Sequence, residues 1–538
     1  MQLQVRLRRA RGSTFSPLSS KPPPSPPPPL PRSAVNGQPT CASQYLADIL
    51  RKDWGFQGYM TSDTGALEDV YRQHKYVATE QEAACVSLIN GTTDVCSGAV
   101  YHDSLLGCPR EAINAALRRT FRLRFQLGLF DPLDSSPYWS TPLSSIGSAA
   151  AQGLNALATR QSLVLLKHSA GAPGALPWAP GARIAVLGPH ANATTALVGN
   201  YLGQLCPDDG FDCIASPYSA IAAINAAAGG RTTLGLGPGL TANNSAAWAS
   251  ALALGQAADA IVLVLGLDGS LEGEDLDRTT LDLPAVQRAF AAAVAALGKP
   301  VVLFLLHGGA LDTSSELALG GITGIVDAFY PGFEGARAMA DTLFGRNEYL
   351  GGKMAVTTYP ASYVDSIQMS DMELDGAVGR GYRFYSGPVV YPFGWGLSLT
   401  SFSLAPAAPL PSNASTLPAE AAPSARLHYA LTVTNTGARA GDEVIQAYFA
   451  PLSTPSQPAS RLRQQLFDYT RVHLAPGESA TVSFAVDSAT LRLSDRASGD
   501  LVSAPGLFEL RFTNGVQLVV GAQVQVTGAQ VTVKSFPY

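Results

Sequence analysis

An aspartate at the end of an apolar segment is the first group in this sequence that could do chemistry. Within Trp54–Ala66, a predicted strand over Tyr59–Ser62 leads into Asp63, and a glycine turn follows. In a β/α barrel, side chains at the carboxyl ends of the strands face the active site, which would place Asp63 as a nucleophile. A Ser-Asp pair after a strand is also a common helix N-cap, so the residues alone leave both interpretations open.

A second group of carboxylates lies in Leu265–Arg278, directly after another predicted strand. The segment contains five acidic residues, among them Glu272 and Glu274, and Arg278 supplies a counter-charge. Loops at the carboxyl edge of a parallel sheet are where ligands bind. The same composition is typical of a solvated surface loop or a Ca²⁺ site, although the spacing of an EF-hand is absent.

Two such carboxylates are what glycoside hydrolysis requires. One carboxylate attacks the anomeric carbon, and the other protonates the leaving oxygen and then activates water. In a retaining enzyme the two groups lie about 5–5.5 Å apart, and two domains that meet at a cleft can supply them. This mechanism needs no metal and no organic cofactor, so none is expected.

Composition limits the classes of protein that this chain can be. It has 538 residues, of which 46% are hydrophobic and 14% charged, which indicates a large core and about three domains. A net charge of -5 gives no electrostatic reason to expect nucleic acid as a partner. No apolar run reaches the roughly 18 residues of a membrane helix. The sequence does not indicate an oligomeric state.

The first two segments differ sharply in composition. Residues 1–34 are basic, rich in Ser and Pro and free of acidic residues, which predicts a disordered Pro-rich extension without a visible secretory signal. Residues 35–146 mix short apolar strands with helices predicted over 79–90 and 109–129.

The rest of the chain divides into an α/β part and a β part. Residues 149–167 are predicted as a helix leading into a strand, and residues 183–345 alternate apolar strands with Ala-rich helices. Such alternation is typical of a mostly parallel, doubly wound sheet, so an α/β domain is expected over 149–400. A Pro/Ala/Ser linker is predicted over 401–426. Period-two alternation within 427–538 predicts a small β-sandwich.

The cysteines indicate an oxidising compartment. Cys206 and Cys213 flank a short Pro/Asp/Gly loop, which suits a local disulfide. None of the six cysteines forms a Cys-x-x-Cys pair, so a zinc ribbon is not expected. Four glycosylation sequons occur, at Asn90, Asn192, Asn243 and Asn413, and their use is left open.

Ordered motifs from about residue 35 to the end resemble glycoside hydrolase family 3, most closely its β-xylosidase branch. They are Val35–Cys41 with Trp54–Ala66, Gly91–Val95, Arg118–Asp131, Arg160–Lys167, Leu187–Asn192, Gly199–Tyr201, Tyr330–Gly332, Gly352–Thr357, Arg380–Tyr385 and Tyr391–Ser398. The resemblance implies the end of a (β/α) TIM-type barrel at 35–146, an α/β sandwich domain and a fibronectin type III-like domain. It also implies secretion to the outside of the cell or the cell wall.

The resemblance assigns roles to three residues. Asp63 corresponds to the nucleophile, and Glu272 to the acid/base within a Ser-x-Glu-x-Glu pattern. Glu274 is the second choice for the acid/base role or a sugar-binding group. The implied reaction is a retaining exo-β-glycosidase releasing terminal β-linked sugars, as in xylan breakdown, from an oligosaccharide or glycoside.

The sequence also departs from the family pattern. The barrel strands that family members carry before the Val-Asn-Gly motif have no counterpart, nor do a Lys-His pair and a tyrosine that precede it. Thr64-Gly65 stands where xylosidases have Cys-Asp, which puts a preference for xylose in doubt. Two hypotheses therefore follow: an active glycosidase, or an inactive or truncated member that at most binds carbohydrate. In the first, Asp63 and Glu272 are expected to face one cleft.

Overall fold

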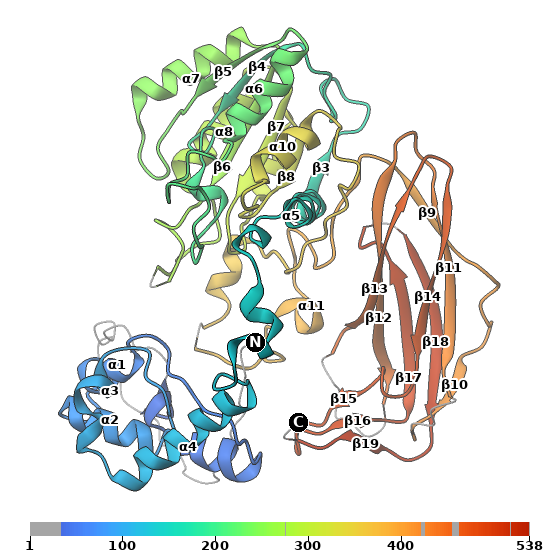
Figure 1. Ribbon diagram of the computed structural model, residues 1–538. Coiled ribbons are helices and arrows are strands. Elements are labelled where there is room, and N and C mark those ends of the chain that lie inside the picture. Colours follow the sequence, from blue (N-terminus) through green and yellow to red (C-terminus); the bar gives the residue numbers. More distant parts are fainter. Residues whose placement is uncertain are drawn as a thin grey trace, which may run out of the picture. The chain divides into compact units, whose positions relative to one another are not determined.

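The computed structural model describes residues 34–274, 276–368, 370–420, 425–454, 462–516 and 518–536. Apart from Ala34, the predicted disordered extension over 1–34 lies outside these residues. The chain divides into two compact units, Met1–Leu143 and Ser144–Tyr538, which are described separately (Figure 1).

The first unit is mainly helical. Its elements are β1 (Ala34–Val35), β2 (Gln38–Pro39), a π-helix (Leu46–Asp53), α1 (Ala66–Arg72), α2 (Glu80–Ile89), α3 (Val100–Ser104) and α4 (Arg110–Gln126). The helices predicted over 79–90 and 109–129 are confirmed as α2 and α4. A capping box begins α2: the Thr79 side chain accepts from the Glu82 backbone, and Glu82 accepts in return from the Thr79 backbone.

A small apolar core holds these helices together. It is formed around Leu67, Leu88 and Val100, which are almost fully buried. A disulfide that the sequence did not predict joins Cys85 to Cys108 beside this core. The strand predicted over Tyr59–Ser62 is reduced to one parallel bridge between Thr61 and Val95.

The second unit begins with α5 (Ala149–Ser162), which runs directly into β3 (Val164–His168), as predicted for 149–167. Its other α/β elements are β4 (Arg183–Leu187), α6 (Pro217–Ala227), β5 (Arg231–Gly235), α7 (Ser245–Ala257), β6 (Ala260–Gly266), α8 (Ala285–Ala295), β7 (Val301–Leu306), α9 (Ser314–Ala318), β8 (Ile322–Asp327), α10 (Gly335–Leu343) and α11 (Gly381–Phe384).

The six strands form one sheet in the order β3-β8-β7-β6-β4-β5, parallel except for β3. This confirms the doubly wound parallel sheet. The chain passes from β4 to β5 on one side and then to β6 on the other side of β4, so the switch point lies between β4 and β6. Ligands bind at this point in such sheets.

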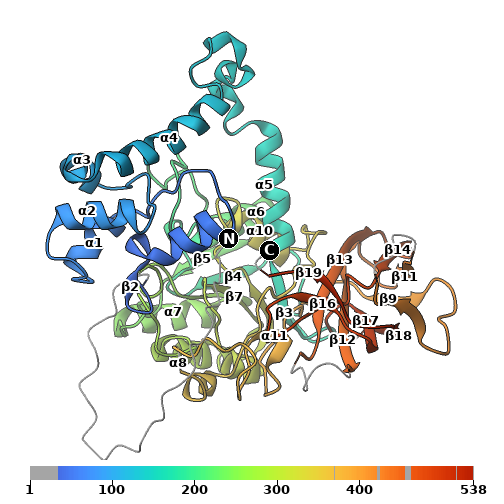
Figure 2. The ribbon, with the colours of Figure 1, turned by 90° about the horizontal axis from the view of Figure 1, so that it is seen from below.

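Helices cover both faces of the sheet, so its central strands are buried throughout. Along β6, Val262 and Val264 pack in one apolar cluster with helices α6 and α10. Ile261 and Leu263 pack in the other cluster, with α7 and α8. Figures 1 and 2 show these two helical layers on opposite sides of the strands. Burial on both faces explains why the strand is a continuous apolar run.

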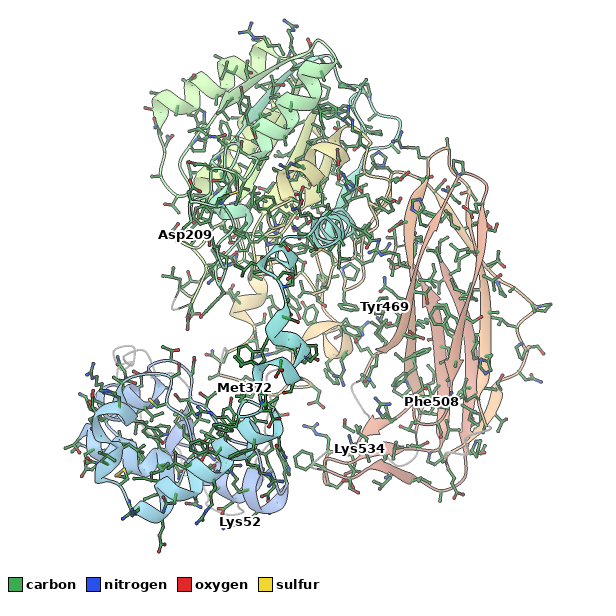
Figure 3. The ribbon with its side chains drawn as sticks, in the orientation of Figure 1. Lys52, Asp209, Met372, Tyr469, Phe508 and Lys534 are labelled. Atoms are coloured by element: carbon green, nitrogen blue, oxygen red, sulfur yellow. A yellow bond between two sulfur atoms is a disulfide. The ribbon has the colours of Figure 1, made fainter. Side chains whose placement is uncertain are left out.

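The predicted β-sandwich forms the rest of this unit. Its strands are β9 (Phe402–Pro406), β10 (Ser415–Pro418), β11 (Leu427–Asn435), β12 (Gly441–Ser453), β13 (Gln465–Leu474), β14 (Ser479–Val486), β15 (Leu493–Ser494), β16 (Leu501–Ser503), β17 (Gly506–Thr513), β18 (Val519–Thr527) and β19 (Val531–Lys534). The orders are β10-β18-β17-β12-β13, β14-β11-β9 and β15-β16-β19. Phe508 lies among the strands of the core, where it packs edge-on against Phe449 (Figure 3).

The linker predicted over 401–426 needs correction, because two strands of the sandwich lie within it. β9 pairs with β11, and β10 pairs with β18. Both are edge strands, and Pro406 and Pro418 each stand at a strand end, where a missing N–H is tolerated. The Pro-rich composition therefore concealed them.

Cys206 and Cys213 form the predicted disulfide. Of the helices in the described ranges, none combines the length and apolar character that crossing a membrane demands.

Candidate active site

Glu272 lies in the loop that follows β6, at the carboxyl edge of the parallel sheet. Residues after the neighbouring strands β7 and β8 reach the same edge, because parallel strands all end there. The strand order places this loop next to the switch point between β4 and β6. The fold itself thus brings a carboxylate to the ligand-binding edge of the sheet.

Four donors hold the Glu272 carboxylate. Its Oε1 accepts from the backbone N–H of Gly308 and from the Tyr330 hydroxyl at 2.8 Å. Its Oε2 accepts from the backbone N–H of Gly309 at 3.1 Å and lies 3.3 Å from Nε of Arg278. The Glu272 side chain is 12% exposed. This carboxylate is therefore fixed in place and does not belong to a freely solvated surface loop.

The two glycines after β7 are required by this arrangement. A Cβ on Gly308 would meet the Tyr330 ring at 2.9 Å, and one on Gly309 would meet the Arg278 guanidinium at 2.7 Å. Only a residue without a side chain lets both N–H groups approach Glu272. The His-Gly-Gly sequence after a buried strand was the available sign of this site, and it is not among the residues predicted from the sequence.

A buried pair of titratable side chains, His307 and Asp327, lies next to these glycines. Nε2 of His307 lies 3.1 Å from Asp327, the last residue of β8, and Nδ1 of His307 is 2.6 Å from the carbonyl oxygen of Gly309. Burial lowers the pKa of His307, but Asp327 and the Gly309 carbonyl outweigh it, so the pKa lies above its ordinary value. A charged imidazole would tie the ends of β7 and β8 together under Glu272.

The surroundings of the Tyr330 hydroxyl favour its protonated form, which can donate a hydrogen bond. Its burial and its hydrogen bond to Glu272 both raise the pKa of Tyr330 far above the ordinary value. The hydroxyl therefore keeps its proton and remains a donor to the carboxylate. The sequence alone places Tyr330 in a family motif and assigns it no role.

Glu274 has different surroundings from Glu272. It is exposed, and its Oε2 accepts a hydrogen bond from the hydroxyl of Tyr201, an exposed residue in the loop after β4. Glu272 and Glu274 thus lie in one loop. The Glu272 carboxylate is held by hydrogen-bond donors, whereas the Glu274 side chain is exposed to solvent.

Asp63 belongs to the first unit. It is exposed, and its Oδ1 accepts from the N–H of Thr64 at 2.7 Å. Helix α1 begins after Gly65, which adopts a left-handed φ of 75° and provides no side-chain cap. Asp63 is therefore not the N-cap of this helix, and that alternative does not hold.

The backbone before Asp63 is fixed to the segment that precedes α3. Ser62 N donates to the Val95 carbonyl at 2.9 Å, and Val95 N donates to the Met60 carbonyl at 3.0 Å. The buried Ser62 hydroxyl accepts from Ser97 N at 2.9 Å. The chain is thus well defined up to the residue before Asp63.

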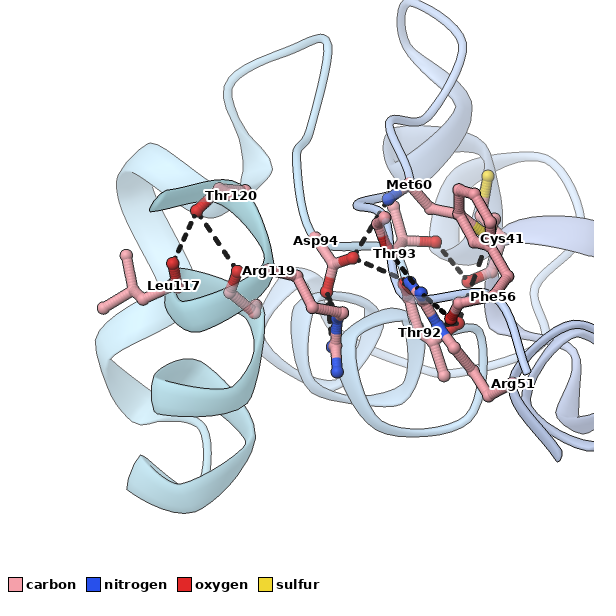
Figure 4. Close-up of polar contacts among 12 residues, drawn as sticks. Cys41, Arg51, Phe56, Met60, Thr92, Thr93, Asp94, Leu117, Arg119 and Thr120 are labelled. Carbon is pink, nitrogen blue, oxygen red and sulfur yellow. Dashed lines mark hydrogen bonds and ion pairs between the residues drawn. The ribbon is translucent and has the colours of Figure 1, made fainter. Parts of the chain in front are cut away.

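Asp94 anchors the same segment, and it lies between Arg119 and the Met60 backbone (Figure 4). Its side chain is fully buried; Oδ2 accepts from Arg51 and from the N–H of Met60, both at 2.9 Å. Oδ1 accepts from Nε of Arg119, on α4, at 2.9 Å. The motif Gly91–Val95 by itself assigns no role to Asp94; the available sign of this role was an aspartate flanked by Thr93 and Val95 on a buried segment.

The acidic loop of Leu265–Arg278 has the composition of a possible Ca²⁺ site. Asp268, instead of standing free, accepts from the N–H and hydroxyl of Ser270. Within the described ranges, no three His, Cys, Asp or Glu side chains gather as a metal-binding group.

Comparisons with known protein families match two regions of the second unit. Residues 163–399 match the glycosyl hydrolase family 3 C-terminal domain. Residues 443–514 match a fibronectin type III-like domain.

Curated relatives match almost the whole chain. A probable exo-1,4-β-xylosidase (bxlB) of Aspergillus terreus is 32% identical over 521 residues, which cover 94% of this chain and 65% of the relative. The exo-1,4-β-xylosidase bxlB of Emericella nidulans is 33% identical over 500 residues, covering 89% and 62%. The chain thus spans somewhat less than two thirds of the length of these relatives.

Solved structures agree with this likeness. A family 3 exo-β-xylosidase, XlnD, in complex with a xylobiose aziridine probe has a TM-score of 0.81 at 28% identity, covering 94% of this chain and 66% of that one. A β-glucosidase from Listeria innocua in complex with glucose has a TM-score of 0.75 at 26% identity, covering 92% and 67%.

Proposed function

Because the chain belongs to glycoside hydrolase family 3, we propose that it acts as, or forms most of, a retaining exo-β-glycosidase. Its substrates would be oligosaccharides or glycosides with a terminal β-linked sugar, with β-xylosides first. The observation that carries this proposal is the likeness to exo-1,4-β-xylosidases over 94% of the chain.

We interpret the first unit as the last part of a (β/α) barrel. The parallel bridge between Thr61 and Val95 has the direction of neighbouring barrel strands. Large apolar side chains at the end of α4 and just beyond it are exposed, including Phe125 at 66% and Leu127 at 63%. Exposed apolar surface of this kind marks a site where further structure packs.

In the proposed mechanism, Asp63 attacks the anomeric carbon and a glycosyl-enzyme ester forms as the leaving-group oxygen takes a proton. Glu272 supplies that proton, and then takes one from the water that hydrolyses the ester. The anchored backbone before Asp63 supports the first role, because a nucleophile must be held close to its target.

Glu274 is a second candidate for the acid/base, favoured by one observation. All donors around Glu272 point at its oxygens, so proton transfer to a leaving group requires one of those contacts to break. Glu274 is exposed, and its Oε2 accepts a hydrogen bond from the Tyr201 hydroxyl. In that case Glu272 would fix the loop and Glu274 would move the proton.

We also propose an extracellular or cell-wall location. Two disulfides, Cys85–Cys108 and Cys206–Cys213, support it, because such bonds persist in oxidising compartments.

Release of nitrophenol from aryl β-xylosides and β-glucosides tests the proposal. The 538-residue chain should be almost inactive, whereas a longer form, extended by the segment that relatives carry before the matched region, should turn over. Absence of turnover by the longer form on every β-glycoside tried would leave the alternative, an inactive carbohydrate-binding protein.

A further inference from the structure

A groove of about 450 Å³ lies in the second unit where the segment around α11 meets the sandwich. One wall carries Tyr382, Tyr385 and Phe393, and the other carries Arg463 and Arg511. Its size lies within the range of small-molecule sites, about 300–1,000 Å³. None of these residues belongs to the candidate active site.

The two walls are held together by direct hydrogen bonds. Arg463 N donates to the Arg383 carbonyl at 2.8 Å, and Leu466 N donates to the Tyr382 hydroxyl oxygen at 3.2 Å. The Arg463 guanidinium also donates to the Tyr385 carbonyl at 3.0 Å. The groove therefore exists before any ligand binds, which lowers the entropic cost of binding.

Aromatic rings form one side of the groove. Tyr382 stacks on Phe393 with centroids 4.3 Å apart, and Tyr385 packs edge-on against Tyr359 and Tyr363. These contacts fix the rings, and they leave an apolar wall beside polar groups. A wall of this kind suits the C–H face of a pyranose ring, whose hydroxyls need partners at its rim.

On the opposite side, the exposed guanidinium of Arg463 has no counter-charge among the described residues. Arg511 is neutralised by Glu509, which it contacts at 2.6 Å. For Arg463, no carboxylate oxygen of a described residue lies within ion-pairing distance. The lining contains no acidic residue. A guanidinium in this position matches a carboxylate, which it can bind through two parallel hydrogen bonds.

Two polar side chains in the lining have hydrogen-bonding capacity that no described residue uses. The buried hydroxyl of Thr357 makes no hydrogen bond to a described residue. The Gln464 side-chain amide nitrogen likewise donates to none of the described groups, and its oxygen accepts only at 3.4 Å, from Arg511. Buried unpaired polar groups are costly, so a ligand hydroxyl at Thr357 would recover a lost hydrogen bond.

We propose that this groove binds an acidic oligosaccharide, a β-linked xylo-oligosaccharide that carries a uronic acid. A xylose ring packs on the aromatic wall, and the uronate carboxylate pairs with Arg463. The choice of xylose rests on the proposed function, whereas the choice of an acidic group rests on the charge of the groove. The site binds and does not catalyse, and it would hold a decorated chain while a free end is cleaved elsewhere.

Isothermal titration calorimetry on the full chain tests the proposal without requiring hydrolysis. The probes are xylotetraose carrying one glucuronic acid and plain xylotetraose. The acidic probe should bind at least about tenfold more tightly, and Arg463→Ala should remove about that factor. Arg492→Ala, on the same sandwich but outside the groove, is the matched control and should bind like the parent chain.

Arg463→Lys guards against a trivial loss of folding, because it keeps the charge and should retain part of the preference. Equal affinity for the two probes, or a preference that survives Arg463→Ala, would overturn the proposal. So would the absence of binding at millimolar concentrations of the acidic probe. Each outcome stands apart from the hydrolysis assay, so failure of the groove and failure of the glycosidase proposal can be distinguished.

Discussion

Replacing Asp94 by Asn should destabilise the first unit strongly. The Asp94 side chain is fully buried and pairs with two arginines, whose side chains are only 14% (Arg51) and 24% (Arg119) exposed. An amide keeps the shape and can still accept from Met60, but it leaves two partly buried positive charges without a counter-charge. Breaking a buried pair in this way costs about 3–5 kcal/mol.

The expected size of the effect follows from the size of the unit. For a domain of about 100 residues, each kcal/mol shifts the melting temperature by about 4–8 °C, so a loss of 3 kcal/mol is about 12–24 °C. Differential scanning calorimetry should show the transition of the first unit moving down by that amount while the transition of the second unit stays in place. Asp48→Asn is the control, because Asp48 pairs with Lys52 on the surface of the same unit and should leave the transition almost unchanged.

A shift of less than about 4 °C for Asp94→Asn would refute the reasoning, because it would mean that the buried cluster contributes less than about 1 kcal/mol. An equal shift for Asp48→Asn would contradict it as well, since burial would then not be the cause.

Three other predictions concern the second unit. In the longer, active form, Glu272→Gln should lower kcat on an aryl β-xyloside about 10²–10⁴-fold and Glu274→Gln less than tenfold, and the reverse order would transfer the acid/base role to Glu274. The pKa of His307 is raised by Asp327, so their pairing stabilises the unit fully below about pH 6.5 and less as the pH rises through the folded-state pKa. Urea unfolding at a series of pH values should show this decline in the free energy of unfolding. The decline should be absent in His307→Asn. Peptide mapping without reductant should find the 206–213 loop closed by its disulfide, and free thiols at both ends in protein from its native compartment would contradict this.

The parallel sheet could be predicted from the sequence because each of its strands can be recognised from its own residues. β6 is a continuous run of apolar, partly β-branched residues, and the Ala-rich segment that became α8 follows it at the usual spacing. The antiparallel direction of the edge strand β3 could not be predicted in that way, because strand direction depends on the path of the chain from α5.

The candidate site was only partly predictable for a similar reason. Its acidic residues stand out in composition, so Glu272 and Glu274 were found. Three of the four groups that hold Glu272 come from segments 36 to 58 residues away along the chain, namely Gly308, Gly309 and Tyr330. Their convergence depends on strand order. As long as the order of the strands in the sheet is unknown, the sequence cannot show which loops lie next to one another.

The central claim, that Asp63 is the nucleophile, is tested most directly by trapping the glycosyl-enzyme. The longer form would be incubated with a 2-deoxy-2-fluoro-β-xyloside, which forms the ester but hydrolyses slowly, and its peptides would be mapped by mass spectrometry. The account predicts a single fluoroxylosyl group on Asp63 and none in Asp63→Asn. A fluoroxylosyl group on any other residue of an active protein would contradict it.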